Sequence, residues 1–205
     1  MGHISAPLDF VPLDRTPWTH RFDDPKRSYR TLYCAQHRET CFLEVFYSQR
    51  PDLIAIKELA ASHGCSFDEA RQQAGKVSLD EILTRSIAPA RIEIESGDVL
   101  DIEDLALRSK LELEHLDSLV AKKLKELDLS LLRSGDRALT RKIGRSLFEK
   151  GASGVAYGSH VDNCLCIALF EGRARLIPDG EPQPLKDVLD ELRASLEKIG
   201  LTLPS

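Results

Sequence analysis

A carboxylate among apolar residues is the first feature of this sequence that could do chemistry. Residues 37–47 are predicted to form a helix, in which Glu44 lies between Leu43 and Val45. A carboxylate on an apolar helix face must find polar partners, because burying it without them costs much free energy. Beside a substrate, Glu44 could stabilise a positive charge that develops during a reaction. Alternatively it is solvated or paired with an arginine at the edge of the apolar stripe, and position alone favours this interpretation.

Three arginines near the N-terminus could bind an anionic ligand. Arg21 is the main candidate, because its planar guanidinium can donate two parallel hydrogen bonds to a phosphate or pyrophosphate. The following Asp23 and Asp24 provide an alternative explanation, a local salt bridge with Arg21. Arg15 and Arg30 are weaker candidates for the same role.

A serine in a glycine-rich turn is a third candidate. Ser159 ends a segment, residues 154–159, that is predicted to be a strand entering a tight turn, and a hydroxyl there can reach a ligand that approaches the backbone. A serine that caps the turn explains the same position equally well. His160 comes next, but adjacent residues rarely align a hydroxyl with a ring nitrogen, and no GxSxG motif surrounds them. An esterase is therefore a distant alternative.

Two other side chains could contact a flat, polar ligand. Tyr33 lies in a short predicted strand at residues 31–35, just before the helix that carries Glu44. Its ring could stack on a planar group, but an inward-facing strand tyrosine is as often part of the core. Asn163 follows the glycine-rich turn and could hold this loop or bind an amide of the ligand.

Composition restricts the class of protein. The chain has 205 residues, of which 42% are hydrophobic and 30% charged, so we expect one domain with its own core. A formal net charge of −5 argues against a dedicated nucleic-acid binder, which usually carries a basic excess. No apolar run is long enough to span a membrane and no secretory signal is recognisable, so we expect a cytoplasmic protein.

The cysteines and histidines do not indicate a metal site. The five cysteines are odd in number and mostly scattered, which favours buried thiols in a reducing compartment over disulfides. The six histidines show neither an HExxH motif nor paired spacing with cysteine. We therefore expect no bound metal.

Strand and helix patterns are mixed without the regular alternation of a parallel α/β sheet, so we predict an α+β fold. No GxGxxG or Walker A motif is present. Residues 91–102 alternate polar and apolar around Ser96-Gly97-Asp98, which predicts a β-hairpin. Residues 104–127 carry an apolar stripe that includes Leu113 and Val120, which predicts one long helix. Further predicted elements are helices with capping boxes at Ser66 and Ser78, a helix at 134–150, strands at 164–170 and 174–177, and a helix at 184–199.

Three stretches, in this order, resemble the RES domain family. The first comprises HRFDDP at residues 20–25, LYCA at 32–35, ET at 39–40 and FLEV at 42–45. The second comprises RALT at 137–140 with residues 151–157, and the third comprises YGS at 157–159 with Asn163 and ALF at 168–170. The family is named for an arginine, a glutamate and a serine, whose counterparts here are Arg21, Glu44 and Ser159.

The resemblance implies an enzyme that cleaves the nicotinamide–ribose bond of NAD⁺, like the toxins of RES–Xre toxin–antitoxin systems. The transition state of this reaction is oxocarbenium-like, which gives Glu44 a charge to stabilise. NAD⁺ is the substrate, and no other cofactor and no metal is implied. The residues that the resemblance places at the site are, for catalysis, Glu44, Arg21 and Ser159, and for substrate binding, Tyr33, Arg15, Arg30, Asn163 and Tyr157.

The resemblance also implies a fold and partners. The fold would be a compact single domain related to the ADP-ribosyltransferases and spanning residues 1–205. Its core would cover about 15–175, with a helical insertion at about 52–130 and a C-terminal helix at 184–199. The implied partners are NAD⁺, inorganic phosphate as one candidate acceptor, an Xre-type helix-turn-helix antitoxin and a second copy in a homodimer. A membrane and direct binding of nucleic acid are not expected.

Alternatives to this function stay open. The ribose could be transferred to phosphate, to water or to a protein, and an acceptor phosphate would need a further cation such as Arg30 or Arg137. A non-catalytic nucleotide-binding module on the same fold is the alternative from another class. It would bind NAD⁺ or ADP-ribose and leave the nicotinamide attached.

Overall fold

The computed structural model describes residues 2–3 and 6–204. Over these residues the chain forms nine α-helices and three small β-sheets, which confirms the predicted α+β fold. The residues form two compact units. The first comprises the described residues up to Pro7, residues 37–89 and the described residues from Gly180 onward, and the second comprises residues 8–36 and 90–179. No helix in the described part of the chain is both long and apolar enough to cross a membrane.

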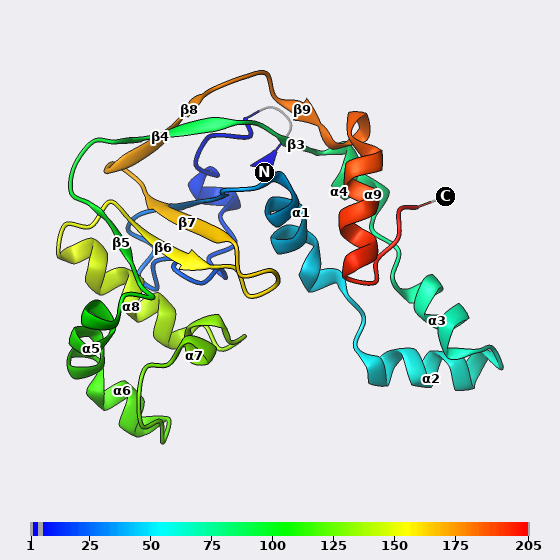
Figure 1. Cartoon of the computed structure of the whole chain (residues 1–205), viewed down its shortest axis with the longest axis horizontal. Coiled ribbons are helices and arrows are strands. Elements are labelled where there is room, and N and C mark those ends of the chain that lie inside the picture. Colours follow the sequence, from blue (N-terminus) through cyan, green and yellow to red (C-terminus); the bar gives the residue numbers. More distant parts are fainter. Residues whose placement is uncertain (1, 4–5, 205) are drawn as a thin grey trace. The chain divides into compact units, whose positions relative to one another are not determined.

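A four-stranded sheet forms the centre of the second unit (Figure 1). The predicted strand 31–35 is confirmed, and the strand predicted at 164–170 begins one residue later. Two of the three strand pairs are antiparallel, and the third, between β5 and β6, is parallel. In order across the sheet, the strands are β2 (Thr31–Ala35), β7 (Leu165–Phe170), β6 (Gly154–Gly158) and β5 (Val99–Asp101).

The predicted β-hairpin at residues 91–102 is wrong. Its two strands form, but β4 (Ala90–Ile94) pairs with β8 (Ala174–Pro178), whereas β5 pairs with β6. The backbone amides of Glu95 and Ser96 both donate to the carbonyl of Arg173, which directs the chain away from a local turn. Alternating polarity predicts that a segment is a strand, but it does not determine which strand is its partner.

The predicted long helix at 104–127 is also wrong, because the chain breaks at His115 (φ −105°, ψ 20°) between α5 (Leu105–Glu114) and α6 (Leu116–Ala121). The break changes which side chains are buried. Leu113 and Val120 of the predicted stripe are 78% and 65% exposed, whereas Leu111 and Leu119 are buried. The helix predicted at 134–150 begins later, as α8 (Ala138–Glu149), and is preceded by the short α7 (Leu129–Arg133).

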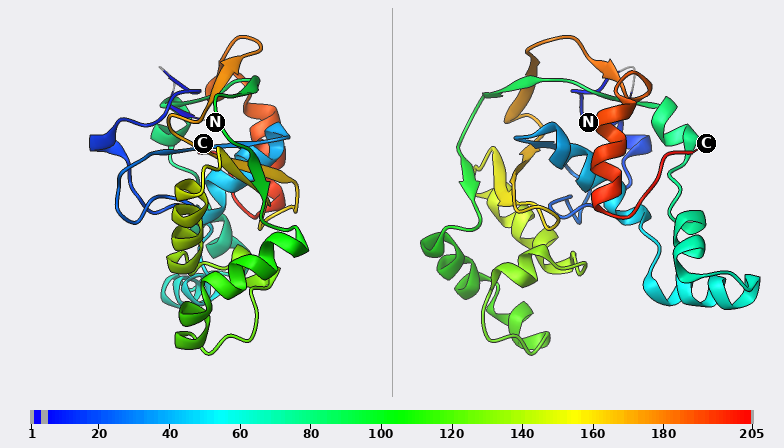
Figure 2. Two further views of the ribbon diagram at one scale, coloured as in Figure 1. Left: turned by 90° about the vertical axis from the view of Figure 1, so that its left-hand side faces the viewer. Right: turned by 45° about the vertical axis from the view of Figure 1, so that its right-hand side comes forward.

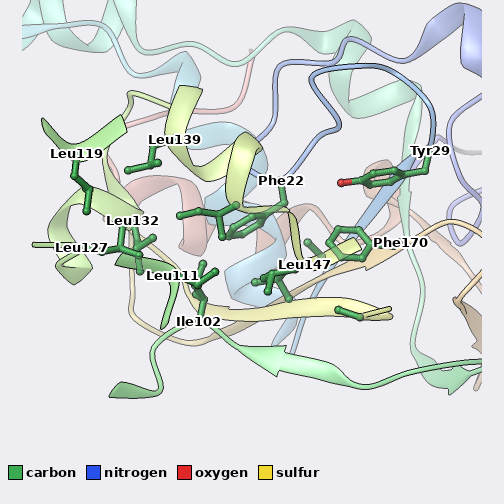
Figure 3. Packing of buried hydrophobic residues seen from close by; sticks show 14 residues of the cluster. Phe22, Tyr29, Ile102, Leu111, Leu119, Leu127, Leu132, Leu139, Leu147 and Phe170 are labelled. Atoms are coloured by element: carbon green, nitrogen blue, oxygen red, sulfur yellow. The ribbon is translucent and has the colours of Figure 1, made fainter. Parts of the chain in front are cut away.

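The core of the second unit is centred on Phe22, which is fully buried (Figure 3). One face of α8 contributes Leu139, Ile143 and Leu147, at the spacing that the sequence predicts for a buried stripe. The sheet contributes Val155, Ala168 and Phe170 from the opposite side, and the short helices α5–α7 contribute leucines. On the edge of this core, the rings of Tyr29 and Phe148 stack with their centroids 3.8 Å apart.

The first unit consists mainly of helices and a three-stranded sheet. In it α1 packs against α9, and ion pairs join Arg38 to Glu191 and Glu39 to Lys198. The α2–α3 pair is visible in Figure 2. The elements of the first unit are β1 (Gly2–His3), α1 (Arg38–Phe46), η2 (Tyr47–Gln49), α2 (Leu53–His63), α3 (Phe67–Ala74), α4 (Leu79–Leu83), β3 (Arg85–Ile87), β9 (Gln183–Pro184), η3 (Leu185–Asp187) and α9 (Leu189–Lys198).

Local signals for these helices are mostly confirmed. Ser66 forms the predicted capping box with Glu69 at the start of α3, but Ser78 makes no side-chain cap at α4. The predicted final helix at 184–199 is a 3₁₀ turn followed by α9. Residues 52–130, predicted to be a helical insertion, contain strands as well as helices and are divided between the two units. The insertion and the single-domain boundaries stay predictions.

Two glycines have the same left-handed backbone, and comparing them tests how tightly the turn between β4 and β5 is packed. Gly97 and Gly172 both have φ +74°. A Cβ at Gly97 would lie 1.9 Å from the carbonyl oxygen of Gly151, whereas a Cβ at Gly172 meets nothing within 4 Å. We predict that Gly172→Ala lowers the free energy of unfolding by about 1 kcal/mol, the cost of the backbone conformation. We predict that Gly97→Ala costs about 2 kcal/mol more, because backbone must move. Urea denaturation measures both, and equal losses would contradict the close contact.

Candidate functional site

The loop that carries Arg21 is attached to α8 by two arginines of that helix and by Arg137, which immediately precedes it. We call residues 18–30 the Arg21 loop. The three arginines lie four residues apart and therefore lie on the same side. Their contacts are Arg137 Nη1 to the Thr19 carbonyl at 2.7 Å, Arg141 Nε to the Asp23 carbonyl at 3.3 Å, and Arg145 Nη1 to the Asp24 carboxylate at 3.0 Å. Gly144, on the same helix, lets the loop approach closely, because a Cβ there would lie 3.1 Å from the carbonyl oxygen of Phe22.

Asp24 organises the second half of this loop. Its carboxylate is fully buried and accepts hydrogen bonds from the amides of Lys26 and Ser28, from the Ser28 hydroxyl and from Arg145. Burial alone would raise the pKa of Asp24, but the hydrogen bonds from Ser28, Lys26 and Arg145 stabilise the ionised form and lower the pKa. The loop is thus closed around a buried anion.

Arg21 itself is buried and is directed at the end of α7. Its guanidinium donates to the carbonyls of Leu132, Arg133 and Ser134, where the helix leaves carbonyl groups without intrahelical partners. Asp23 and Asp24, the salt-bridge partners that the sequence suggests, accept hydrogen bonds from the His20 amide, the Tyr33 hydroxyl and Arg145. Three carbonyls at the end of α7 therefore orient the guanidinium.

Two tyrosines border the Arg21 loop. The Tyr33 hydroxyl accepts from the Phe22 amide at 2.9 Å and donates to Asp23 Oδ1 at 3.1 Å, and burial together with the charge of Asp23 raises the pKa of this phenol well above its usual value. The ring centroids of Tyr33 and His20 lie 5.3 Å apart. The ring of Tyr157 meets Phe22 edge to face, with the centroids 5.2 Å apart. Both tyrosines therefore lie against the loop that carries Arg21.

Ser159 caps the turn between β6 and β7. Its hydroxyl oxygen accepts from the amides of Val161 at 3.1 Å and Asp162 at 3.4 Å, and the side chain is buried. The turn-capping role that the sequence allows is therefore present. Asn163, in the same turn, has a left-handed backbone (φ 63°) and is exposed. We call residues 158–164 the Ser159 turn.

A pair of charged residues that no sequence pattern predicts, Glu103 and Arg133, lies beside this turn. Glu103 Oε1 accepts from Arg133 Nη2 at 2.6 Å and from the Gly158 amide at 3.0 Å. Burial raises the pKa of Glu103, but the hydrogen bonds from Arg133 and Gly158 outweigh this and lower it, so the residue is anionic at neutral pH. Glu103 follows a strand and Arg133 ends a short helix, and no local pattern indicates that they meet across 30 residues.

The remaining predicted residues lie elsewhere in the two units. Arg15 is exposed on a 3₁₀ turn, η1 (Leu13–Arg15). Arg30 forms an ion pair with Glu171 through Nε and Nη2, and its Nη1 donates to the carbonyls of Phe10 and Val11. Glu44 belongs to the first unit, where it is half-buried on α1 next to the buried Leu43. The second unit thus holds all predicted site residues except Glu44.

Within the described residues no group of three or more His, Cys, Asp or Glu side chains is arranged to hold a metal ion, and no disulfide forms. A depression of about 490 Å³ lies along β5 and α5, lined by residues that include Leu100 and Leu107. None of the predicted site residues lines it.

The second unit is therefore an α+β unit in which a buried arginine, two tyrosines and a capped serine turn are held in fixed positions. The chain belongs to the RES domain family, whose model matches residues 2–188. RES domains are in general toxins that degrade NAD⁺. The predicted family resemblance is thus confirmed, and the match contains Arg21, Glu44 and Ser159. No curated protein and no solved structure matches the chain.

The buried carboxylate of the Arg21 loop predicts a pH-dependent stability. Because the pKa of Asp24 is lower in the folded state than the unfolded value of about 3.9, the ionised group stabilises the fold above that pH. This contribution is lost as the pH falls through the folded-state pKa. We predict that Asp24→Asn lowers the free energy of unfolding by about 2 kcal/mol at neutral pH. The difference from wild type should shrink between about pH 5 and pH 2.

Urea denaturation across this pH range measures the effect. Asp190→Asn is the matched control, because that carboxylate is 98% exposed. A difference between wild type and Asp24→Asn that does not change with pH would contradict the lowered pKa of Asp24.

Proposed function

We propose that this protein cleaves the bond between nicotinamide and ribose in NAD⁺. The observation that carries the proposal is the family match over residues 2–188, which includes the arginine, the glutamate and the serine for which the family is named. In the reaction the bond from C1′ to the nicotinamide nitrogen breaks, and its electron pair leaves with the neutral nicotinamide. An acceptor oxygen then bonds to C1′ and loses its proton to solvent.

Glu44 is the proposed electrostatic catalyst. As the bond breaks, positive charge develops on the ribose, and a carboxylate already in place stabilises this charge without reorganising. Its position supports the role, because Glu44 is half-buried on a helix whose neighbouring Leu43 and Phe46 are buried. A partly desolvated carboxylate attracts a cation more strongly than one in water.

Arg21 is proposed to bind the pyrophosphate. The three carbonyls at the end of α7 hold the guanidinium in one orientation, so little side-chain entropy remains to be lost when an anion binds. The three acceptors are themselves neutral groups. Arg30, by contrast, is neutralised by Glu171, and an anion there would have to compete with that ion pair.

Tyr33 and the Ser159 turn are proposed to hold the reacting end of the substrate. The hydroxyl of Tyr33 is bonded at the Arg21 loop, which fixes the orientation of the ring for stacking on nicotinamide. Ser159 uses its oxygen as an acceptor in the turn, so the proton of its hydroxyl is the group offered to a ligand. Substrate contacts of Tyr157, Asn163 and Arg15 belong to the same proposal.

The acceptor and the protein partners are part of the proposal. Of the two cations considered for an acceptor phosphate, Arg30 is paired with Glu171, and Arg137 donates through Nη1 to the Thr19 carbonyl. Because both arginines already have partners, they do not distinguish between water and phosphate as the acceptor. Family membership supports an Xre-type helix-turn-helix antitoxin as partner, and by the same analogy we propose a homodimer.

The decisive variant is Glu44→Gln, which removes the charge and keeps the shape. We predict that it lowers kcat for nicotinamide release by about 10²- to 10³-fold, the usual effect of removing one electrostatic stabiliser. Glu39→Gln is the matched control, because Glu39 lies on the same helix and pairs with Lys198 at the surface. Wild type and both variants are incubated with NAD⁺, with and without phosphate, and the products are weighed by mass spectrometry.

The outcomes separate the alternatives. ADP-ribose as product names water as the acceptor, and ADP-ribose phosphorylated at C1′ names phosphate. A melting temperature that rises with NAD⁺ while nicotinamide stays attached would support a non-catalytic binding module. ADP-ribose transferred from NAD⁺ and attached to a protein would support a protein ADP-ribosyltransferase. Undiminished release by Glu44→Gln would refute the role of Glu44.

A further inference from the structure

Glu103 lies outside the three stretches that carry the family resemblance, and its contacts connect the two polar segments of the candidate site. We infer that Glu103 is a positioning residue that holds the Ser159 turn in register with the Arg21 loop, an inference that rests on the proposed function of those two segments. The inference depends on a continuous series of contacts within the second unit.

The first contact joins Glu103 to the turn. A single carboxylate oxygen, Oε1, accepts from the Gly158 amide at 3.0 Å and from Arg133 Nη2 and Nε at 2.6 and 3.3 Å. The side chains of Glu103 and Arg133 are only 28% and 27% exposed, so solvent screens the pair less than it would a surface ion pair. Because Gly158 immediately precedes Ser159, this amide sets the direction in which the turn begins.

The second contact joins the same pair to Arg21. The backbone carbonyl of Arg133 accepts from Arg21 Nη2 at 3.2 Å, and the carbonyls on either side of it accept from Nη1. Arg133 thus bonds to Arg21 through its backbone and to Glu103 through its side chain. Arg21 and Gly158, which lie more than 130 residues apart in the chain, are thus connected through Arg133 and Glu103.

The third observation is the tight packing at Gly158. A Cβ there would lie 2.7 Å from Arg133 Nη2, 2.9 Å from Glu103 Oε1 and 3.0 Å from Asn163 Oδ1. Only glycine lets these three polar groups approach the backbone so closely. Two side chains from other parts of the unit and one from the turn itself therefore meet at Gly158, next to Ser159.

The position of the turn matters more for rate than for stability. A displacement of about 1 Å at a reacting group can lower a rate by up to about 10²-fold. In Glu103→Gln the Gly158 hydrogen bond can persist, but the charge that holds Arg133 is lost. We predict that Glu103→Gln lowers kcat for nicotinamide release about tenfold, with less than a twofold change in KM for NAD⁺. The melting temperature should stay close to that of wild type.

Arg133→Met provides the second variant and a double-mutant cycle. If Glu103 acts through Arg133, the double variant loses no more activity than the more affected single variant, whereas independent effects multiply. Glu93→Gln is the matched control, because Glu93 pairs with Arg175 at 2.6 Å in the same unit but in an exposed position. It should leave both kcat and KM unchanged.

The experiment measures kcat, KM and melting temperature for all five proteins, together with amide hydrogen exchange in peptides that cover residues 158–164. Faster exchange in Glu103→Gln than in Glu93→Gln, with the fall in kcat, is the expected result. A wild-type kcat in Glu103→Gln, or multiplicative losses in the cycle, would overturn the inference and leave the proposed function intact. Absence of nicotinamide release by wild type would instead overturn the proposed function, and the inference with it.

Discussion

The second unit depends on the insertion of Phe22 into the core beside α8. The side chain is fully buried, and its backbone passes so close to the helix that Gly144 can carry no larger side chain without displacing it. Arginines on the same helix face then bond to the backbone and to Asp24 on either side of Phe22. An irregular loop has no backbone ladder of its own, so these contacts provide its order. Because Phe22 is fixed in the core, the adjacent Arg21 is held in position as well.

Two arginines of this unit illustrate how partners decide the use of a cation. Arg30 faces a carboxylate, and the Arg30–Glu171 ion pair joins β2 to the end of β7 while cancelling the charge. Arg21 faces three carbonyls, which fix its direction. The same type of side chain is thus part of an ion pair in one case and, under the proposed function, the group that binds an anion in the other. This difference supports Arg21, more than Arg30, as the ligand of a pyrophosphate.

The proposed chemistry needs little from the protein beyond correct placement. Breaking the nicotinamide–ribose bond releases a good leaving group, so a carboxylate for the developing charge and rigid contacts at the two ends of the substrate are the main requirements. The family supplies the expectation that Glu44, Arg21 and Ser159 meet these requirements. The Glu103–Arg133 pair adds a physical reason why Arg21 and Ser159 would keep the same relative positions during turnover.

The sequence by itself determined the features that depend on near neighbours. These are the strand at Thr31–Ala35, the helix that carries Glu44, the capping box at Ser66 and the buried stripe of α8. The motif order also sufficed to predict the family. Only the tertiary structure decided the partners of β4 and β5, the break at His115, the carbonyls around Arg21 and the meeting of Glu103 with Gly158. Helix periodicity and caps join residues at most a few positions apart. Apart from the local break at His115, the contacts that only the tertiary structure decided join residues 55 to more than 100 positions apart, and such pairings depend on how the whole unit packs.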